Sequence, residues 1–325
     1  MRLTLPVTLL STGLNDTVTR LRDRIDTTSK EAVTGQYSDL TAHLSGRIGK
    51  AMLSQKAIDD LTNERTQLTL KAGRLDVIQR SLTVIHDDID QLGIRMKAAM
   101  GSEDFTAREA VVRDAQAALR STFAVLNTRY GERYLFAGDA TSTKPFGDPD
   151  TFLSDVRTMA AGATDAADFA TQMDAYFNTP GDGWQLNVYA GAATASDPAG
   201  VTGMDPAVTQ ILSGLAVLAL SGADDTLALF EGSSEAVLAA TDTIADGQAK
   251  LTNVRAERGI MQSQIERSQE SLDLEETILT QVFNQMTARD QYEAASELKQ
   301  LETSLEASYT LTARLANLSL LNYMR

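Results

Sequence analysis

Cysteine is absent from this 325-residue chain, and histidine is nearly absent, with only His43 and His86. Without cysteine, no disulfide framework, thiol nucleophile or thiolate metal site can form. The two histidines lie far apart in sequence, and neither has a second histidine at the helical spacing that a metal pair needs. We therefore expect neither a metal nor another cofactor.

Positive charge is also scarce, because 29 Lys and Arg against 44 Asp and Glu give a net charge of −15. An acidic surface repels phosphate, so a nucleic-acid partner is not expected. The longest apolar run, Ile211–Leu220, is about half the length that spans a bilayer, and it predicts a buried helix without membrane insertion. The opening MRLTLPVTLLSTG lacks a small-x-small cleavage site, so we expect no cleaved secretory signal.

Two long heptad repeats dominate what is present. The first places apolar residues at Leu61, Leu68, Leu75, Leu82, Ile89 and Met96, with Ile78, Ile85, Leu92 and Ala99 on the second seam. The second repeat runs through Val237, Ile244, Leu251, Arg258, Ile265, Leu272, Leu279 and Met286, with Val254, Met261 and Val282 beside it. The shared period predicts two antiparallel coiled-coil arms within one chain. Arg258 occupies a core slot, where it must pair or reach solvent.

A shorter helix is predicted after the first repeat, which ends near Gly101. Thr106 and Glu109 form a capping-box pattern, with Phe105 in front as a hydrophobic staple. Gly131 suits the left-handed position that closes a helix. In the second repeat the register slips near residues 289–290 and then resumes towards the C-terminus.

The middle of the chain is richer in Gly, Pro, Asp and Ala. Asp165–Phe177 has a helical stripe, and Asp205 followed by Pro206 is typical of a helix start. Trp184–Tyr189 alternates large apolar with polar residues, which predicts a strand. These patterns predict a small α+β domain.

Both ends of the chain carry thinner apolar stripes. The first 35 or so and last 30 or so residues bury too little apolar area to offset their ordering entropy, so we expect them to be disordered in an isolated monomer. We predict that they form an assembly interface, completed by each other and by neighbouring subunits. Its residues are Leu14, Val18, Leu21, Ile25, Leu298, Leu301, Leu305, Leu315 and Leu318.

The predicted fold class is therefore mainly α, a long antiparallel coiled-coil bundle built from N- and C-terminal segments, with a small inserted α+β domain. Residues 1–45 with 290–325 form the terminal assembly helices, 46–132 with 232–289 the coiled-coil shaft, and 133–231 the inserted variable domain.

The stretch RYLFAGDATSTKPF (133–146) directly follows the shorter helix predicted after the first repeat. It concentrates aromatic residues, which make up only 6% of the whole chain. Aromatic and Gly/Pro clusters at a domain boundary serve packing and turning. We therefore predict a joint between shaft and inserted domain at Tyr134, Phe136, Gly138, Pro145 and Phe146.

Catalytic patterns are weak. SGRIGKA, around Gly46 and Lys50, approaches a phosphate-binding loop, but its glycines are too close together and Ala51 stands where magnesium needs Ser or Thr. With two histidines, a Ser-His-acid triad has almost no support. The sequence favours a structural protein over an enzyme.

Three stretches are distinctive: YLFAGDATSTKPF (134–146), VRAERGIMQSQIE (254–266) and the C-terminal segment from YEAASELKQ to LSLLNYMR (292–325). Together they resemble the bacterial flagellin superfamily of flagellar axial proteins, most closely its hook–filament junction subunits. In the early segment VTGQYSDLTAHLSG, Thr34, Gly35 and Asp39 match the family pattern, whereas its prolines are absent. The resemblance covers roughly the first 146 and last 120 residues.

The resemblance implies a non-catalytic subunit that assembles with copies of itself and contacts hook-associated protein 1 and flagellin. It further implies an extracellular position in the flagellum, export through the flagellar type III apparatus without a cleaved signal, and a dedicated export chaperone that masks the C-terminal helix.

Three alternatives stay open. One is flagellin, the filament subunit of the same superfamily. Another is a coiled-coil stalk of a signalling or adhesin protein, which would dimerise through residues 61–96 instead of pairing them within one chain. The last is an enzyme.

Overall fold

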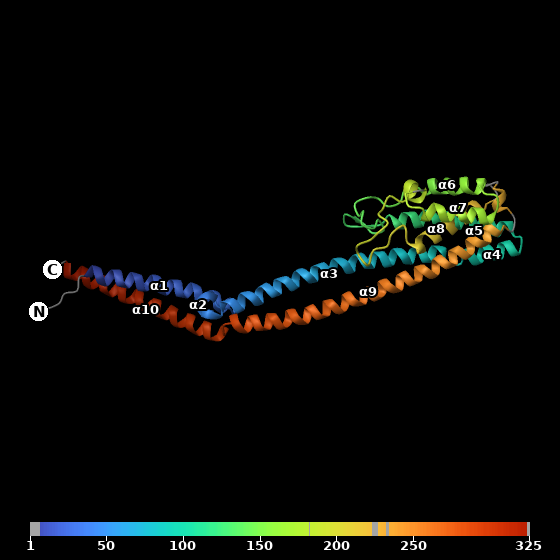
Figure 1. Ribbon diagram of the computed structural model, residues 1–325. Coiled ribbons are helices and arrows are strands. Elements are labelled where there is room, and N and C mark those ends of the chain that lie inside the picture. The colour runs from blue at the N-terminus through green and yellow to red at the C-terminus, as the bar shows by residue number, and fades with distance from the viewer. Residues whose placement is uncertain (1–6, 182, 223–226, 232–233, 324–325) are drawn as a thin grey trace. The chain divides into compact units, whose positions relative to one another are not determined.

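The computed structural model describes residues 7–181, 183–222, 227–231 and 234–323, and these are mainly α-helical, as the sequence predicts (Figure 1). The chain divides into two compact units. Unit 1 takes Met1–Thr66 and Glu270–Arg325, and unit 2 takes Gln67–Gln269. The finer three-part division expected from the sequence stays a prediction.

Unit 1 contains the helices from both ends of the chain. In chain order they are α1 (Val7–Thr34), α2 (Leu40–Leu44), a 3₁₀ turn (Ser45–Arg47) and α10 (Gln291–Tyr323). The long helices α3 (Ile48–Ile89) and α9 (Glu235–Thr287) contribute their first and last turns, respectively, to unit 1 and the remainder to unit 2.

Unit 2 adds the shorter elements. They are α4 (Leu92–Gly101), α5 (Phe105–Leu126), β1 (Arg129–Tyr130), β2 (Arg133–Tyr134), α6 (Pro149–Gly162), α7 (Ala166–Asn178), α8 (Pro206–Leu220) and a 3₁₀ turn (Ala228–Phe230). The two short strands pair antiparallel, with Arg129 opposite Tyr134 and Tyr130 opposite Arg133. The inserted segment thus combines short helices and long irregular stretches with a single small β element.

Helices α3 and α9 lie antiparallel within unit 2. Gln79 Nε2 donates to the Arg255 carbonyl at 2.8 Å, and Gln269 Nε2, later on α9, donates to the hydroxyl of Thr69, earlier on α3, at 3.3 Å. The heptad residues Leu75, Leu82 and Ile89 and the second-seam residues Ile78 and Ile85 are buried between the helices of unit 2.

The predicted pairing of Arg258 is confirmed. Its side chain is only 8% exposed. The guanidinium donates to the carbonyl oxygens of Ala199 (3.1 Å) and Gly200 (2.9 Å), and it also lies 3.2 Å from Glu257. A charge in a heptad core position is thus satisfied by a loop of the inserted segment, as a buried charge requires.

Aspartate starts several helices of unit 2. Asp148, Asp165 and Asp205 each accept a hydrogen bond from a backbone N–H in the first turn, and Pro follows directly at the start of α6 and α8. A carboxylate there satisfies an otherwise unpaired donor and complements the helix dipole. The helix starts predicted at Asp165 and Asp205 are therefore confirmed.

The core of unit 2 is aromatic. Phe146, Phe152 and Trp184 are fully buried, and Trp184 packs edge-on against both phenylalanines at centroid distances of 6.0 and 5.4 Å. The indole Nε1 donates to the Gly203 carbonyl at 3.0 Å, so the buried polar atom is paired. In Figure 1, α6, α7 and α8 lie together beside α5.

Three local predictions are wrong. The segment Trp184–Val188 forms one π-helical turn instead of a strand, which places Trp184 and Val188 inward together. Helix α5 is capped by Asp104, whose side chain accepts from the Ala107 N–H, and not by Thr106. Gly131 lies beyond the end of α5, in the turn between β1 and β2, with a φ of +60°.

A break between α3 and α4 was also not predicted. Gln91 adopts a left-handed φ of +66° and ends the continuous helix that the heptads suggested. The seam residues Leu92 and Met96 are nevertheless buried on the far side of this break.

Candidate assembly interface

Helices α1 and α10 lie side by side and pack along their length in unit 1 (Figure 1). Among the predicted interface residues, Leu301 is buried, and the side chains that are half-buried are Val18, Leu21, Ile25, Leu298 and Leu305. The side chains of Leu14, Leu315 and Leu318 lie outside the described residues. The structure therefore brings the described part of the predicted set together, and its role in assembly stays a prediction.

The end of α1 is joined to the junction between α9 and α10 by main-chain contacts. The Tyr37 N–H donates to the Thr287 carbonyl (3.1 Å), and the Arg289 N–H donates to the Gly35 carbonyl (2.9 Å). Asp290 then caps α10 by accepting from the Tyr292 N–H at 2.8 Å. The register slip seen in the sequence near residues 289–290 thus coincides with a helix break that is held by pairing with the other end of the chain.

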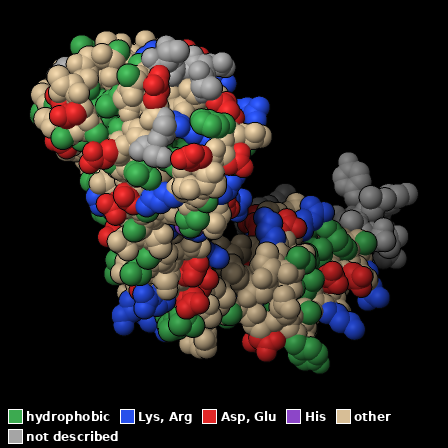
Figure 2. Space-filling model, turned by 90° about the vertical axis from the view of Figure 1, so that its right-hand side faces the viewer, with side chains coloured by type: hydrophobic (Ala, Val, Ile, Leu, Met, Phe, Trp, Pro, Cys, Tyr) green, Lys and Arg blue, Asp and Glu red, His purple; other side chains and the backbone are tan. Residues whose placement is uncertain are grey.

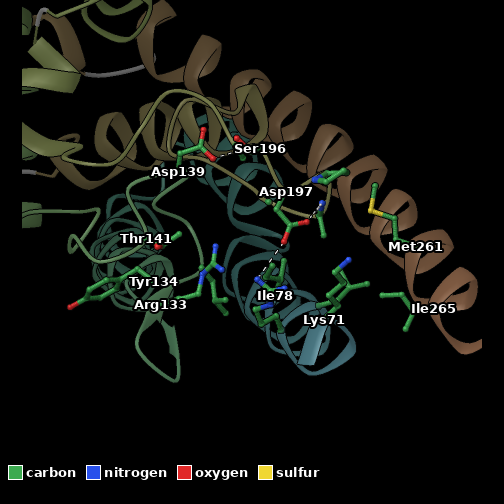
Figure 3. A pocket seen from close by; sticks show the side chains of 18 of the residues that line it. Lys71, Ile78, Arg133, Tyr134, Asp139, Thr141, Ser196, Asp197, Met261 and Ile265 are labelled. Carbon is green, nitrogen blue, oxygen red and sulfur yellow. Dashed lines mark hydrogen bonds and ion pairs between the residues drawn. The ribbon is translucent and has the colours of Figure 1, made fainter. Parts of the chain in front are cut away.

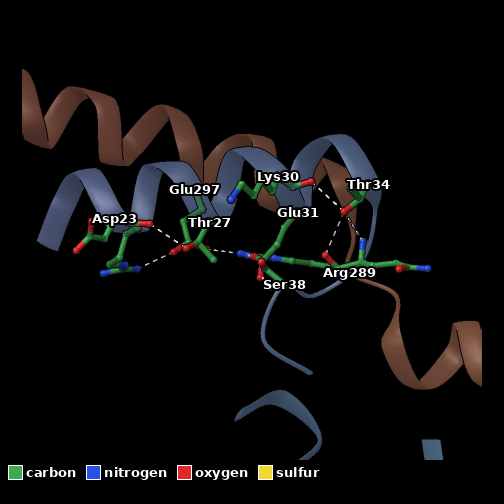
Figure 4. A network of polar contacts seen from close by, with 10 residues as sticks. Asp23, Thr27, Lys30, Glu31, Thr34, Ser38, Arg289 and Glu297 are labelled. Atoms are coloured by element: carbon green, nitrogen blue, oxygen red, sulfur yellow. Dashed lines mark hydrogen bonds and ion pairs between the residues drawn. The ribbon is translucent and has the colours of Figure 1, made fainter. Parts of the chain in front are cut away.

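A buried ion network lies at this junction (Figure 4). The Arg289 guanidinium, 11% exposed, contacts the carboxylates of Glu31, 6% exposed, and Glu297. Glu31 also accepts from the Ser38 N–H at 2.8 Å, and Glu297 pairs with Arg24 at 2.6 Å. Because each buried charge has a partner, removing one would leave another uncompensated.

The electrostatics of the network follow from its two arginines. Hydrogen bonding from Arg24, with a further contribution from Arg289, holds the pKa of Glu297 below its usual range. The folded protein thus favours the charged form of the Glu297 carboxyl.

Aromatic side chains extend the network. Arg289 lies over the ring of Tyr37, 5.5 Å from its centroid, and Tyr37 stacks on His43 at 3.6 Å. Further along, Arg22 donates to the Tyr309 hydroxyl at 2.6 Å. Sequence reasoning missed these contacts, because ion pairs and stacks between distant segments leave no periodic pattern.

Apolar side chains remain exposed on the same helices. Val33 on α1 is 79% exposed, and Tyr292 and Leu311 on α10 are 84% and 54% exposed. Unit 1 thus combines a polar, half-buried seam with apolar side chains that its own helices leave in solvent. Figure 2 views the protein from the end of unit 2 that carries α4, and there too hydrophobic, acidic and basic side chains are interspersed.

The predicted joint lies within unit 2 and begins at Tyr134, the last residue of β2. Phe136 and Phe146 are fully buried, Pro145 is buried, and Tyr134 is half-buried. Gly138 has a φ of +60°, and a Cβ there would lie 2.5 Å from the Thr194 carbonyl oxygen. The segment therefore turns sharply and anchors two rings in the core, although its role as a joint between domains stays a prediction.

Asn127 ties the joint to the end of α5. Its side-chain oxygen accepts from the Phe146 N–H, and its side-chain nitrogen donates to the Phe146 carbonyl, both at 3.0 Å. The Tyr189 hydroxyl donates to the Ala192 carbonyl at 2.9 Å. These hydrogen bonds pair backbone groups of a buried loop that have no partner in a helix or a sheet.

A cleft of about 420 Å³ lies beside this joint, between α3, α9 and the loop 195–200 (Figure 3). Two of its charged side chains, Arg74 and Asp139, are engaged by that loop. Arg74 lies 3.5 Å from Asp197, and Asp139 accepts from the Ser196 N–H at 2.7 Å, which holds the pKa of Asp139 below its usual range. The arrangement secures the loop and presents no nucleophile paired with a base.

Other chemical and membrane features are limited. Within the described ranges, no group of three or more His, Cys, Asp or Glu side chains could hold a metal ion. No helix in the described part of the chain is long and apolar enough to cross a membrane.

Fold and site together define a mainly α-helical bundle protein in which helices from the two ends of the chain form one ion-paired unit. Residues 241–324 match the family model for the bacterial flagellin C-terminal helical region. This region takes most of α9 and all of the described α10, including Arg289 and Glu297. The match supports a flagellin-type structural component of the bacterial flagellum, a class that is generally non-enzymatic.

Two solved structures are similar to this chain at low identity. The FlgL protein of Bacillus cereus is 14% identical, with a TM-score of 0.37 over 73% of this chain and 96% of its own. A putative flagellar hook-associated protein of Vibrio parahaemolyticus is 15% identical, with a TM-score of 0.35 over 74% and 93%. No curated protein sequence matches the chain.

Proposed function

We propose that this chain is a junction subunit of the bacterial flagellum, similar to hook-associated protein 3, which joins hook to filament without catalysis. The observation that carries the proposal is the matched C-terminal region, whose last helix α10 packs against the first helix α1. A subunit built this way presents the two ends of its chain as one assembly element.

The proposed mechanism is mechanical. Pairs formed by α1 and α10 in neighbouring subunits pack into a tube wall, and the exposed side chains of Val33, Tyr292 and Leu311 become buried there. Burial of such side chains provides roughly 1.5–3 kcal/mol each when it is complete. The buried Glu31–Arg289 contact holds the end of α1 against the junction that precedes α10, and in this way it sets where the two helices meet.

The proposed partners are copies of the chain itself, hook-associated protein 1, flagellin and an export chaperone. The proposed location is extracellular, at the hook–filament junction, after export through the flagellar type III apparatus without a cleaved signal. The absence of cysteine suits passage through a narrow channel, because no disulfide can block unfolding.

A deletion strain of the parent bacterium tests the proposal. Loss of a junction subunit should leave hooks without filaments, together with unpolymerised flagellin in the medium. The wild-type gene should restore filaments, and electron microscopy with analysis of the culture medium reads both results. Normal filaments in the deletion strain would contradict the proposal.

Flagellin is the second candidate, because the matched family model describes flagellin. Its deletion would also remove filaments, but no filament monomer would then accumulate in the medium. A coiled-coil stalk is the third. The contacts between α3 and α9 within one chain weigh against it, and a stable parallel dimer in analytical ultracentrifugation would favour it.

A further inference from the structure

An exposed apolar stripe runs along the last turns of α9, in unit 1. Leu274, Ile278 and Val282 follow each other at intervals of four residues and are 68%, 62% and 42% exposed. Side chains at this spacing lie on one helix face. Glu270 and Glu275 lie at the same helical spacing, four residues before Leu274 and three before Ile278, and both are exposed. We call these five residues the α9 stripe.

A second exposed patch lies at the start of α3, also in unit 1. Met52 and Leu53 are 68% and 70% exposed, and Lys50 lies one helical turn before Leu53. Gly49 lies on the same side, and a Cβ added to it would meet no atom within 4 Å. We call these four residues the α3 patch. Nothing within the described chain fills the space over Gly49, so the surface there is open to a close approach.

The two surfaces complement each other in charge. Within the described residues, no ion pair is recorded for Lys50, Glu270 or Glu275, although the neighbouring Asp273 and Glu276 both lie 3.3 Å from Arg65. One surface is thus apolar with acidic side chains, and the other is apolar with a basic side chain. Most of the surface of a chain with a net charge of −15 repels an acidic surface. The basic and apolar α3 patch is therefore a favourable docking site for the acidic and apolar α9 stripe.

We propose that the α3 patch of one copy of this chain binds the α9 stripe of a second copy. This rests on the proposed function, in which neighbouring subunits lie side by side, and it adds a contact beyond the paired terminal helices. Ile278 and Val282 pack over Gly49 and against Leu53, while Lys50 pairs with Glu275. Because the contact joins two different surfaces, repeating it from copy to copy builds a ring or a helical array.

The position of the two surfaces supports a staggered contact. Thr69 lies opposite Gln269, and Arg65 lies opposite Asp273 and Glu276, so α3 and α9 run antiparallel. By the same register, Leu53 lies near the level of residue 287 on α9. Ile278 is about nine residues away from that level, or roughly 13 Å along the helix axis at 1.5 Å per residue. Neighbouring copies joined in this way are therefore displaced along the helix axis.

The absence of cysteine provides a clean test. Two full-length variants, Leu53→Cys and Ile278→Cys, carry tags of different size and are expressed together in the parent bacterium. Flagella are isolated and treated with a short bis-maleimide. The proposal predicts a cross-linked heterodimer of the two tagged chains. Leu186→Cys, 75% exposed in unit 2, replaces Ile278→Cys as the matched control and should give no such band above background.

The outcomes separate this inference from the proposed function. If the chain is present in flagella and the heterodimer does not exceed the control, the inference is wrong and the proposed function stands. A cross-link from either position to another protein instead of a second copy also overturns it. If the chain is absent from flagella, the proposed function fails, and the same pair at high concentration in solution then decides the contact.

Charge exchange tests the ion pair within the contact. Lys50→Glu and Glu275→Lys should each lower the heterodimer yield by about two- to five-fold, the range for one exposed ion pair, and the double variant should recover it. Gly49→Gln fills the open surface and should block the contact without altering the fold, as circular dichroism would show. Unchanged yield in Gly49→Gln would contradict the close approach.

Discussion

The two ends of the chain and its middle differ in the side chains that they bury between their helices. In unit 2, Phe146, Phe152 and Trp184 are fully buried among each other, and the indole has its own carbonyl acceptor. In unit 1, the buried positions include Glu31 and Thr28, and large apolar side chains such as Tyr292 stay exposed. The middle is held by a buried aromatic core, whereas the ends are joined largely by polar pairing. Exposed apolar side chains occur in both units, for example Tyr292 in unit 1 and Phe105 in unit 2.

The largest effect is expected from a cavity in the core of unit 2. Phe146→Ala removes a fully buried ring that packs against Phe123, Trp184 and Tyr189, and it should destabilise unit 2 by about 3–5 kcal/mol. The chain has a single tryptophan, Trp184, so urea unfolding followed by its fluorescence reports on unit 2 alone. Leu186→Ala, at an exposed site, should leave the midpoint nearly unchanged, and equal shifts in both variants would refute the closed core.

Next comes the buried ion network of unit 1. Arg289→Leu leaves Glu31 buried without its partner, and it should weaken the pairing of α1 and α10 by about 3 kcal/mol. Limited proteolysis should then cleave within α1 sooner, while the Trp184 fluorescence transition stays in place. Arg24→Leu is the matched control, because Arg24 is 63% exposed and its ion pair with Glu297 contributes less than about 1 kcal/mol. If both variants were cleaved at the same rate, the network would not hold the helices together.

A smaller effect separates two glycines of unit 2 that share a φ of +60°. Gly131→Ala meets no atom within 4 Å and should cost only the left-handed penalty of about 1–2 kcal/mol. Gly138→Ala adds collisions with the carbonyl oxygens of Thr194 (2.5 Å) and Ala192 (2.6 Å), so it should cost about 1–3 kcal/mol more. Thermal unfolding monitored by Trp184 measures the difference, and equal costs would mean that the joint relaxes freely.

The smallest expected effect is a pH dependence in unit 1. The pKa of Glu297 is lowered by Arg24 and Arg289, so its stabilising contribution is present above the usual Glu pKa of about 4.3 and is lost as the pH falls below it. The loss should be under about 1 kcal/mol, because the group is partly exposed. Hydrogen exchange of α1 between pH 6 and pH 3 would detect it, and Glu297→Gln should flatten that step.

Sequence periodicity predicted much of the helical framework. Leu75, Leu82 and Ile89 recur every seven residues and are buried, because this spacing keeps one helix face against its partner. The core arginine was also foreseeable, since a charge at a heptad position needs a partner. The helix break at Gln91 could not be foreseen, because glutamine carries no intrinsic preference for a positive φ.

Short segments and polar contacts between distant segments were harder to predict from the sequence. The run from Trp184 to Val188 alternates like a strand, yet its two large apolar ends are also one helical turn apart, so periodicity alone cannot decide between the two structures. The Glu31–Arg289 contact joins opposite ends of the chain and leaves only the register slip near residue 289 as a trace. Tertiary pairing, and not local propensity, decides such sites.

Hydrogen exchange measured by mass spectrometry on the isolated chain and on isolated flagella tests the central claim most directly. The account predicts that, in the isolated chain, residues 7–34 and 291–323 exchange much faster than the core of unit 2, and that both become protected in flagella. Protection of these two segments equal to that of the unit 2 core in the isolated chain would contradict it.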